Sequence, residues 1–202
     1  MLWLVGAFDI SFGVHGRIPF EEFSGYASTG VGADVGMRYF FGISQLFGVS
    51  LEGGATYFFQ KNFSDSTGRF KIKMTSQPNY FPFHANLLMK FYVGENMHAI
   101  VSLGGGGNYT VMNTTFTTYK YDTLSNVWEE MEKNKKEVQS SFGYLLNFSF
   151  ALRLEDFDVF AGINIFSINS EVFNLLTGEF EEKNSAYSNF YFGARYFVKF
   201  GI

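Results

Sequence analysis

The sequence has no cysteine, only three prolines among its 202 residues, and no long apolar run. The absence of cysteine excludes thiol catalysis, disulfide bonds and cysteine-ligated metal sites. The apolar stretches fall short of the roughly 18–20 uninterrupted residues that a transmembrane helix requires. Positive charge is also scarce, because the net charge is −4 and the pI is about 5.4. A nucleic-acid partner has no support from bulk electrostatics, and we expect none.

Aromatic residues are abundant in the chain. Phe occurs 27 times and Tyr 12 times, and apolar residues make up 47% of the sequence, yet the mean hydropathy is only +0.01. This balance arises when apolar and polar residues alternate instead of gathering in runs. A length of 202 residues suits one domain, so we expect residues 1–202 to form a single domain.

The stretch 188–200 shows the alternation over about a dozen residues. One face is wholly apolar, and the other mixes glycine, asparagine and cations with two aromatics. A period of two predicts a strand, because successive side chains point to opposite faces. The run exceeds the about 5–6 residues of a typical soluble strand and reaches the roughly 9–11 that cross a bilayer.

The same pattern recurs along the chain. Strands are expected near residues 2–14, 30–41, 47–59, 81–93, 97–107, 142–153, 159–166 and 188–200. The connections between them alternate long and short, and the long polar ones cover residues 15–29, 60–80, 113–137 and 169–186. Outer-membrane barrels have an even strand number, short periplasmic turns and long outer loops. We therefore predict an all-β fold: an eight-stranded antiparallel up-and-down transmembrane β-barrel with four long extracellular loops and three short periplasmic turns.

Two stretches carry a resemblance to a known family. Residues 80–92 read Tyr-Phe-Pro-Phe-His-Ala-Asn-Leu-Leu-Met-Lys-Phe-Tyr, with the glycine run 104–107 following, and residues 193–197 read Gly-Ala-Arg-Tyr-Phe. With the strand pattern, they resemble the small eight-stranded outer-membrane β-barrel family, the OmpA/OmpX-like and OmpW-like group. The resemblance implies a monomer in the outer membrane of a Gram-negative cell, in contact with outer-membrane lipid. Residues 1–5 lack the basic region and the cleavage site of a secretory signal, so we expect the signal peptide to have been removed.

Polar side chains of the strands should face the barrel interior, because an eight-stranded barrel is just wide enough for side chains to fill it. The expected interior network comprises Asp9, Asp34, Arg38, Glu52, His84, Asn86, Lys90, Asn147, Arg153, Asn164 and Arg195. The expected neighbours are Arg38 with Ser50 and Glu52, Asn147 with Asn164, Arg153 with Asp158, and Asp9 with Arg195 at comparable depth. Buried charges are costly unless they are paired, so we expect this network to close the lumen.

Aromatic side chains near the strand ends should lie at the membrane interfaces, where barrels carry aromatic girdles. The expected interfacial residues are Trp3, Tyr39, Tyr57, Tyr144 and Tyr196. Within the longest loop, residues 119–129 have the pattern of a hairpin standing beyond the membrane, and the Glu/Lys-rich segment from Glu129 could instead form a short helix.

Histidine does not indicate a metal site. His84 and His98 should both point inward on adjacent strands, but register about the turn 94–96 separates them by some seven residues, or roughly 23 Å. His15 falls in the first long loop, where we expect it on the surface. The glycine run 104–107 lacks the lysine and the helix of a phosphate-binding loop and is typical of sharp curvature or close backbone approach. We expect no metal and no cofactor.

Several functions remain open from the sequence. We expect an integral outer-membrane protein with a structural role, a surface-interaction (adhesin-like) role, or a role in the passage of small or apolar solutes. Its loops could bind an extracellular ligand or a host surface. A narrow channel is one alternative, and a soluble lipocalin-like barrel with apolar residues inside is another. A lipid-modifying enzyme is least favoured, because no catalytic spacing is present.

Overall fold

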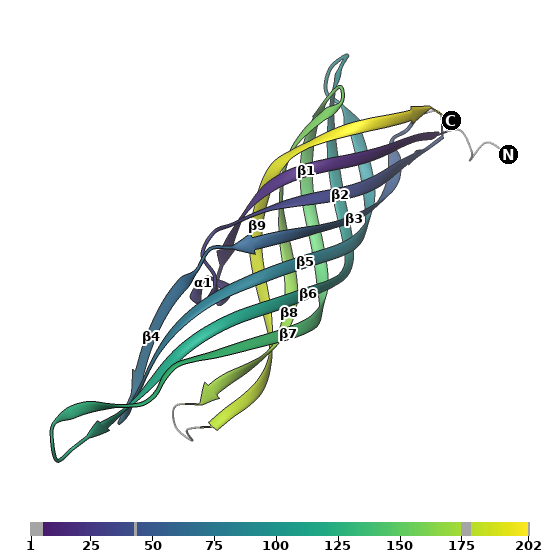
Figure 1. Cartoon of the computed structure of the whole chain (residues 1–202). Helices are drawn as coiled ribbons and strands as arrows, with labels where there is room; N and C mark the ends of the chain where they lie inside the picture. The colour runs from purple at the N-terminus through teal and green to yellow at the C-terminus, as the bar shows by residue number, and fades with distance from the viewer. Residues whose placement is uncertain (1–5, 43, 175–178, 202) are drawn as a thin grey trace.

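The computed structural model describes residues 6–42, 44–174 and 179–201 of the chain (Figure 1). It consists of nine strands and one short helix within these ranges. The elements in order are β1 (Gly6–Phe20), α1 (Phe23–Tyr26), β2 (Gly30–Phe41), β3 (Phe47–Phe58), β4 (Lys61–Thr67), β5 (Phe70–Tyr92), β6 (Met97–Asp122), β7 (Val127–Leu154), β8 (Phe157–Asn174) and β9 (Glu179–Gly201). No helix in the described ranges is long and apolar enough to cross a membrane.

The sheet closes on itself through eight of the strands. Each strand pairs antiparallel with its neighbour, β3 pairs with β5, and β1 pairs with both β2 and β9. Strand β4 lies outside this ring, because it pairs with the first part of β5 alone. Closure gives every strand of the ring two partners, as a sheet surrounded by hydrocarbon requires. The predicted eight-stranded up-and-down barrel is therefore confirmed.

Apolar side chains cover the outside of the ring. Leu87 is 69% exposed, and Phe12, Val35 and Leu103 are exposed as well. Their sequence neighbours point inward and are mostly polar, because successive strand residues point to opposite faces. A soluble lipocalin-like barrel would have the opposite arrangement, so that alternative is wrong.

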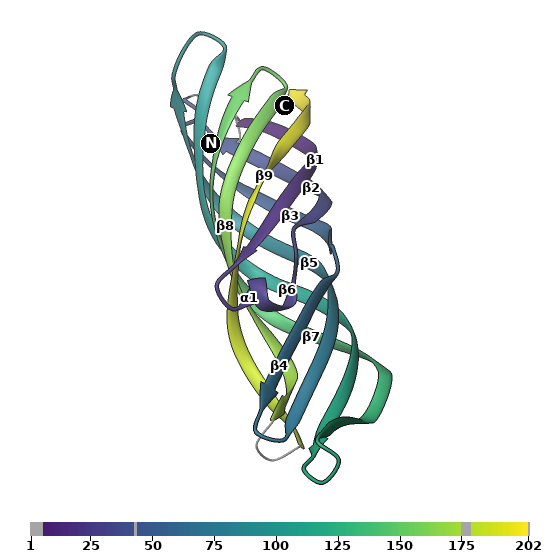
Figure 2. The same ribbon diagram turned by 90° about the vertical axis from the view of Figure 1, so that its left-hand side faces the viewer.

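The two ends of the barrel differ, as Figures 1 and 2 show. Tight connections join β2 to β3, β5 to β6 and β7 to β8 at the end where both termini lie. At the other end several strands continue well beyond the ring, and the helix α1 lies near the mouth of the barrel. The predicted alternation of short turns and long connections is thus present.

Much of what the sequence predicts as long loops is strand. β1 continues through His15 to Phe20, and residues 61–76 form the hairpin of β4 with β5. The hairpin of residues 119–129 is present, but the helix considered after Glu129 is wrong, since β7 runs through this segment. The projecting sheet buries few apolar side chains, Ile72 and Phe116 among them, and is otherwise mostly polar, so its composition resembles that of a loop. Residues 175–178, within the long connection predicted for residues 169–186, lie outside the described residues.

The glycine run in β6 permits close packing of the barrel wall. A Cβ at Gly104 would lie 2.1 Å from the carbonyl oxygen of Ala85, and one at Gly106 would lie 2.1 Å from that of Phe83. Both positions therefore exclude any larger residue unless the backbone shifts. Nearby, the ladder between β3 and β5 skips Pro82, which has no N–H to donate.

Candidate functional site

The barrel interior contains a chain of alternating charges that begins near the periplasmic end. An Arg153 Nη1 donates to the Asp9 carboxylate at 2.7 Å, and its Nε donates to Asp158 at 2.9 Å. Asp158 also accepts from Nη1 of Arg38 at 2.6 Å. Asp158 is fully buried, so it joins two guanidinium groups in a site that water does not reach. Both guanidinium groups also stack on the ring of Phe197, at 4.7 Å for Arg38 and 3.8 Å for Arg153.

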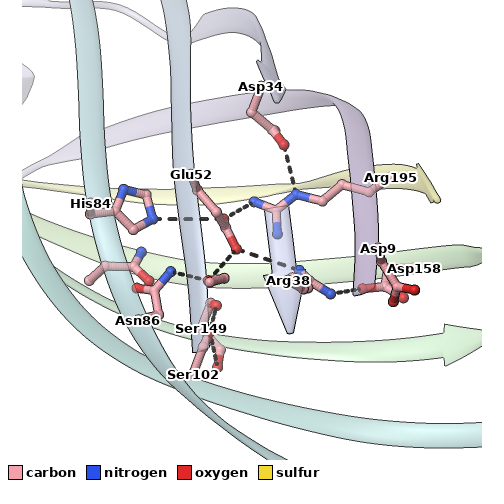
Figure 3. Close-up of polar contacts among 12 residues, drawn as sticks. Asp9, Asp34, Arg38, Glu52, His84, Asn86, Ser102, Ser149, Asp158 and Arg195 are labelled. Atoms are coloured by element: carbon pink, nitrogen blue, oxygen red, sulfur yellow. Dashed lines mark hydrogen bonds and ion pairs between the residues drawn. The ribbon is translucent and has the colours of Figure 1, made fainter. Parts of the chain in front are cut away.

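The charge chain continues across the lumen through Glu52 (Figure 3). Its carboxylate lies 3.6 Å from Arg38 Nη2 and 2.7 Å from Arg195 Nη2. Arg195 Nε in turn donates to Asp34 at 2.7 Å. His84 Nε2 lies 3.7 Å from the Glu52 carboxylate, which is too far for a hydrogen bond but close enough for an electrostatic contact.

The upper part of the chain joins His15 to two polar side chains. Asp34 contacts His15 Nδ1 at 3.1 Å, and His15 Nε2 lies 2.8 Å from the hydroxyl of Thr56. Arg17 donates from Nε to the same hydroxyl at 2.9 Å and from Nη1 to Asn189 at 2.9 Å. The network therefore runs unbroken from Asp9 to Asn189 and contacts six strands of the ring. These strands are β1, β2, β3, β7, β8 and β9.

Thr56, His15 and Asp34 are joined in the order hydroxyl, imidazole and carboxylate, which is the order of a hydrolase triad. The Thr56 hydroxyl group is not accessible, since the residue is only 2% exposed. The cavity lined by His15, Asp34 and Arg195 has a volume of about 10 Å³, which is enough for roughly one water molecule and no substrate. These contacts link β1, β2 and β3 inside the barrel.

Uncharged polar groups complete the interior. Asn147 donates to Asn164 at 2.7 Å and to the hydroxyl of Tyr191 at 2.6 Å. Asn86 donates to Ser50 at 2.9 Å, which donates to Glu52 at 3.1 Å. Within the described residues, no cluster of three or more His, Cys, Asp or Glu side chains could hold a metal ion.

The extracellular mouth of the barrel is filled by an aromatic cluster under α1. Phe23 is fully buried, and its ring lies 5.2 Å from Phe58, 5.2 Å from Phe166 and 5.4 Å from Tyr187. The contacts with Phe58 and Phe166 are edge-to-face, the arrangement that the ring quadrupole favours. Below this cluster, the Arg17 guanidinium lies between the rings of Tyr80 and Tyr191. The lumen is therefore filled by charged groups at one level and by rings at the next.

Most of the predicted interior residues share one connected network. Arg38 lies opposite Ser50, Asn147 opposite Asn164, and Arg153 opposite Asp158 in the strand registers. Lys90 stands apart, because its ammonium lies over the ring of Phe40 at 4.3 Å and contacts Gln45.

Two expectations about the interior need correction. Asp9 and Arg195 are not at the same depth, since Asp9 lies opposite Lys199 and Arg195 lies opposite Gly13. The stagger of a closed barrel shifts the first strand against the last, and sequence gives no direct view of that shift. His15 is not on a surface loop, because β1 continues past it and buries it.

Sequence reasoning also missed Arg17, Thr56 and Asn189, which extend the network upward. The signal for Arg17 was present, because Asp9, Ser11, Gly13, His15 and Arg17 keep one alternation without a break. Residues 15–29 are mostly polar, and this composition favours a loop even though the alternation continues to Arg17.

The predicted interfacial aromatics lie on the outer surface where they are described. Tyr57 is 48% exposed, Tyr144 52% and Tyr196 56%, and Tyr39 is half-buried. Trp3 lies outside the described residues. Further rings join this surface, since Tyr109 packs between Phe81 and Phe142 with centroids 6.1 and 4.6 Å away.

A second candidate site stands above the barrel. We call it the extension, and it comprises β4, residues 70–76 of β5, residues 113–122 of β6 and residues 127–138 of β7. These segments form one continuous antiparallel sheet through the ladders β4–β5, β5–β6 and β6–β7. Unlike the ring, this sheet is open. The ladder between β7 and β8 covers only Leu145–Leu154 of β7, and no strand in the described ranges pairs with the outer side of β4.

No protein-family profile and no curated protein matches the chain. Two solved structures of Ail, the attachment invasion locus protein of Yersinia pestis, are similar to it with TM-scores of 0.51 and 0.50 and identities of 15% and 14%. Both comparisons cover 96% of this chain and 100% of Ail, and one Ail structure is a complex with the heparin analogue sucrose octasulfate. Neisserial surface protein A matches with a TM-score of 0.35 and 9% identity, covering 94% of this chain and 96% of its own. The chain thus has the fold of the small eight-stranded outer-membrane β-barrels, and the OmpA/OmpX-like resemblance holds for the fold.

Proposed function

We propose that this protein is a monomeric outer-membrane surface-interaction protein, in which a filled barrel anchors the extension outside the cell. The observation that carries the proposal is the continuation of ring strands into an open sheet. β5, β6 and β7 run without interruption from the barrel into the extension, so the barrel holds the sheet rigidly. In this proposal residues 1–202 form one domain, and its partners are outer-membrane lipid and an extracellular ligand.

The outer edge of β4 supports this role. An edge strand presents backbone N–H and C=O groups that can pair with an extended segment of another protein. Natural proteins usually protect such edges, yet the seven residues of β4 contain no proline, and no strand in the described ranges pairs with the outer side of β4. The side chains of Asn62, Ser64 and Ser66 are small or polar and leave the edge accessible.

One face of the extension combines cations with aromatic rings. Lys71 lies opposite Tyr119 in the ladder, and the Lys73 ammonium lies 5.5 Å from the centre of the same ring. Tyr121 and Trp128 follow on this face in a tilted ring pair. Such a surface suits an anionic polysaccharide, because sugar rings stack on aromatics and sulfate groups attract ammonium groups. The complex of Ail with a heparin analogue is compatible with this proposal.

A loop-replacement experiment tests the proposal. Asn113 and Val138 are partners in the β6–β7 ladder, so an Asn-Gly turn can replace residues 114–137 between them. The matched control replaces residues 170–183 in the same way, because Asn169 and Asn184 are partners in the β8–β9 ladder. Each protein, reconstituted in nanodiscs, is assayed for binding to immobilised heparin and to cultured epithelial monolayers.

We expect the first replacement to reduce binding about tenfold or more, which is the loss of a few contacts of ordinary strength. The control replacement should bind as the intact protein does. Equal binding by the intact protein and the first variant would contradict the proposal, and so would no binding by the intact protein on either surface. Heat-dependent gel mobility is the control for folding, and both variants should keep a folded barrel.

The interior network is proposed to close the lumen in this function. The wild-type protein in a planar bilayer should then show conductance near zero, and Glu52→Ala should raise it by removing the carboxylate that bridges Arg38 and Arg195. Asp65→Ala, in the exposed β4, is the matched control and should leave conductance unchanged. An open wild-type channel would favour the pore alternative instead.

A further inference from the structure

The outer edge of β4 offers a defined set of backbone groups to a further strand. A two-residue turn follows Thr67 in the β4–β5 hairpin, and the pair that flanks such a turn is hydrogen-bonded. Because hydrogen-bonded pairs alternate along an antiparallel ladder, the N–H and C=O groups of Asn62, Ser64 and Ser66 point away from β5. The Ser66 N–H donates to the Asp65 carboxylate at 2.7 Å, in agreement with this assignment. The backbone groups of Asn62 and Ser64 are thus the part of the edge that a further strand can use.

The side chains on one face of β4 follow a charge pattern. Lys61, Phe63 and Asp65 share this face, because successive strand residues point to opposite faces. Phe63 is 41% exposed beside its ladder partner Met74, and Asp65 is exposed. The helix α1 packs beside the start of β4, where Lys61 is half-buried, and residues 62–67 are exposed (Figure 1). The face therefore presents a cation, an aromatic ring and an anion in order along the edge.

This order is complementary to itself in an antiparallel pair. When Phe63 of one β4 lies opposite Phe63 of a second β4, Lys61 of each copy lies opposite Asp65 of the other. Opposite charges directly across from each other and paired aromatic rings both stabilise antiparallel strands. In the same register Asn62 lies opposite Ser64, so the outward backbone groups of the edge form the hydrogen-bonded pairs.

Other self-pairing registers lose these contacts. A register centred on Ser64 sets Phe63 opposite Asp65 and requires the Ser66 N–H, which already donates to Asp65. A register centred on Asp65 sets two carboxylates opposite each other, which is destabilising. One centred on Asn62 sets Lys61 opposite Phe63. The β4 sequence therefore favours one register and complements an identical strand, which selects a second copy of this chain over an unrelated segment.

The direction of the pairing places the two copies in different membranes. An edge meets the same edge of an identical copy about a two-fold axis perpendicular to the sheet, so the two strands are antiparallel. In Figure 1, β4 runs from the mouth of the barrel toward the far end of the extension. The barrels of two paired copies therefore lie at opposite ends of the joined sheet. Copies in one membrane all point the same way and cannot make this contact.

We propose that β4 is a self-recognition strand, which pairs with β4 of a second copy in an opposing membrane and so joins two cells that carry this protein. Each copy stays a monomer in its own membrane. The inference rests on the proposed surface-interaction function and names a second copy of the chain as a partner. The contact covers about five residues a side, so a single pair is weak, and many pairs between two surfaces act together.

The test uses full-length protein in phosphatidylcholine vesicles, with one set of vesicles labelled green and the other red. Fluorescence cross-correlation counts the vesicles of the two colours that move together. Lys61→Asp and Asp65→Lys each set like charges opposite each other in self-pairing. A mixture of the two variants, one on each vesicle set, restores opposite charges at both positions. Lys136→Asp, at an exposed site on β7, makes the same charge change away from the β4 edge and is the matched control.

We expect the parent protein to join the two vesicle sets. Each single variant, when present on both sets, should join about tenfold fewer vesicles, because repulsion replaces both attractive pairs and many contacts act together. The mixture of Lys61→Asp with Asp65→Lys should restore joining, and Lys136→Asp should join vesicles as the parent does. The proposal is overturned if the parent joins no vesicles or joins protein-free vesicles equally well, if either single variant joins them as the parent does, or if the mixture does not recover.

The heparin and monolayer assays separate failure of this inference from failure of the proposed function. Binding to heparin or monolayers by an intact protein that joins no vesicles would retain the proposed function and overturn the self-pairing. Vesicle joining without binding to either surface would retain the self-pairing and contradict the proposed ligand. Heat-dependent gel mobility is the control for folding, and recovery in the mixture also requires that both variants are folded.

Discussion

The ring and the extension are built from the same strands but have opposite surroundings. In β6, the residues up to about 112 have one face toward the apolar exterior and one toward the packed interior, whereas within residues 113–122 only Phe116 and Thr118 are buried. The ring needs strict alternation and closed edges, and the extension needs neither. A strand therefore carries two composition patterns along its length, and the change between them marks where the barrel ends.

The charges differ in the same way. Within the described interior, Asp9, Asp34, Glu52 and Asp158 face three arginines and His15 at short distances, and all these side chains are nearly buried. In the extension, Asp65 accepts a hydrogen bond from the next residue of β4, and Asp122 accepts one from the turn that follows β6. Buried ion pairs depend on each partner, because an orphaned charge in the interior is costly, while exposed charges are screened by solvent.

The largest expected contrast comes from removing one carboxylate in each region. Asp158→Ala leaves Arg38 and Arg153 without their shared partner and should lower the free energy of unfolding by about 3–5 kcal/mol. Asp65→Ala in β4 should change it by less than about 0.5 kcal/mol. Urea unfolding in lipid vesicles measures both. Similar losses for the two variants would mean that the interior charges are solvated and the contrast is false.

An intermediate effect is expected from a methyl group on either side of the barrel wall. Gly106→Ala places a Cβ against the Phe83 carbonyl, so the wall must shift, and we expect a loss of about 1–3 kcal/mol. Gly105→Ala points outward, where the nearest atom to its Cβ is 3.3 Å away, and should cost less than about 0.5 kcal/mol. The temperature of the gel-mobility transition ranks the two. Equal transitions would show that glycine serves flexibility here and not packing.

The smallest expected effect is on the stability of the turn between β6 and β7, at the far end of the extension. Hydrogen bonds from the Ser125 hydroxyl, and then from the backbone N–H groups of Leu124 and Ser125, lower the pKa of Asp122 below its ordinary value of 3.8. A lowered pKa in the folded state means that the turn is stabilised at pH above 3.8 and loses this support as the pH falls through the lowered pKa. Amide chemical shifts of Leu124 and Ser125 should follow that acid titration, and Asp122→Ala should abolish it. The barrel's unfolding midpoint should stay the same in Asp122→Ala, because the group is fully exposed.

Particular residues show where sequence reasoning succeeds. Arg38 and Ser50, or Arg153 and Asp158, are joined by short turns, so counting outward from the turn gives their register. Arg195 and Asp34 are 161 residues apart, and no such count joins them. Their contact depends on how far the closing strands are staggered, which is a property of the whole ring. Arg17 was missed for the related reason that a polar run hides the end of β1.

By itself, the sequence determined the strand alternation, the even strand number, and which face of each strand is apolar, because a period of two is a local property of the chain. It also determined the pairs across short turns. Only the tertiary structure decided the order of the interior charges, the burial of His15, the aromatic filling under α1, and the open sheet above the membrane. These depend on closure and stagger, which bring together side chains from strands that are distant in the chain, and no local pattern encodes that distance.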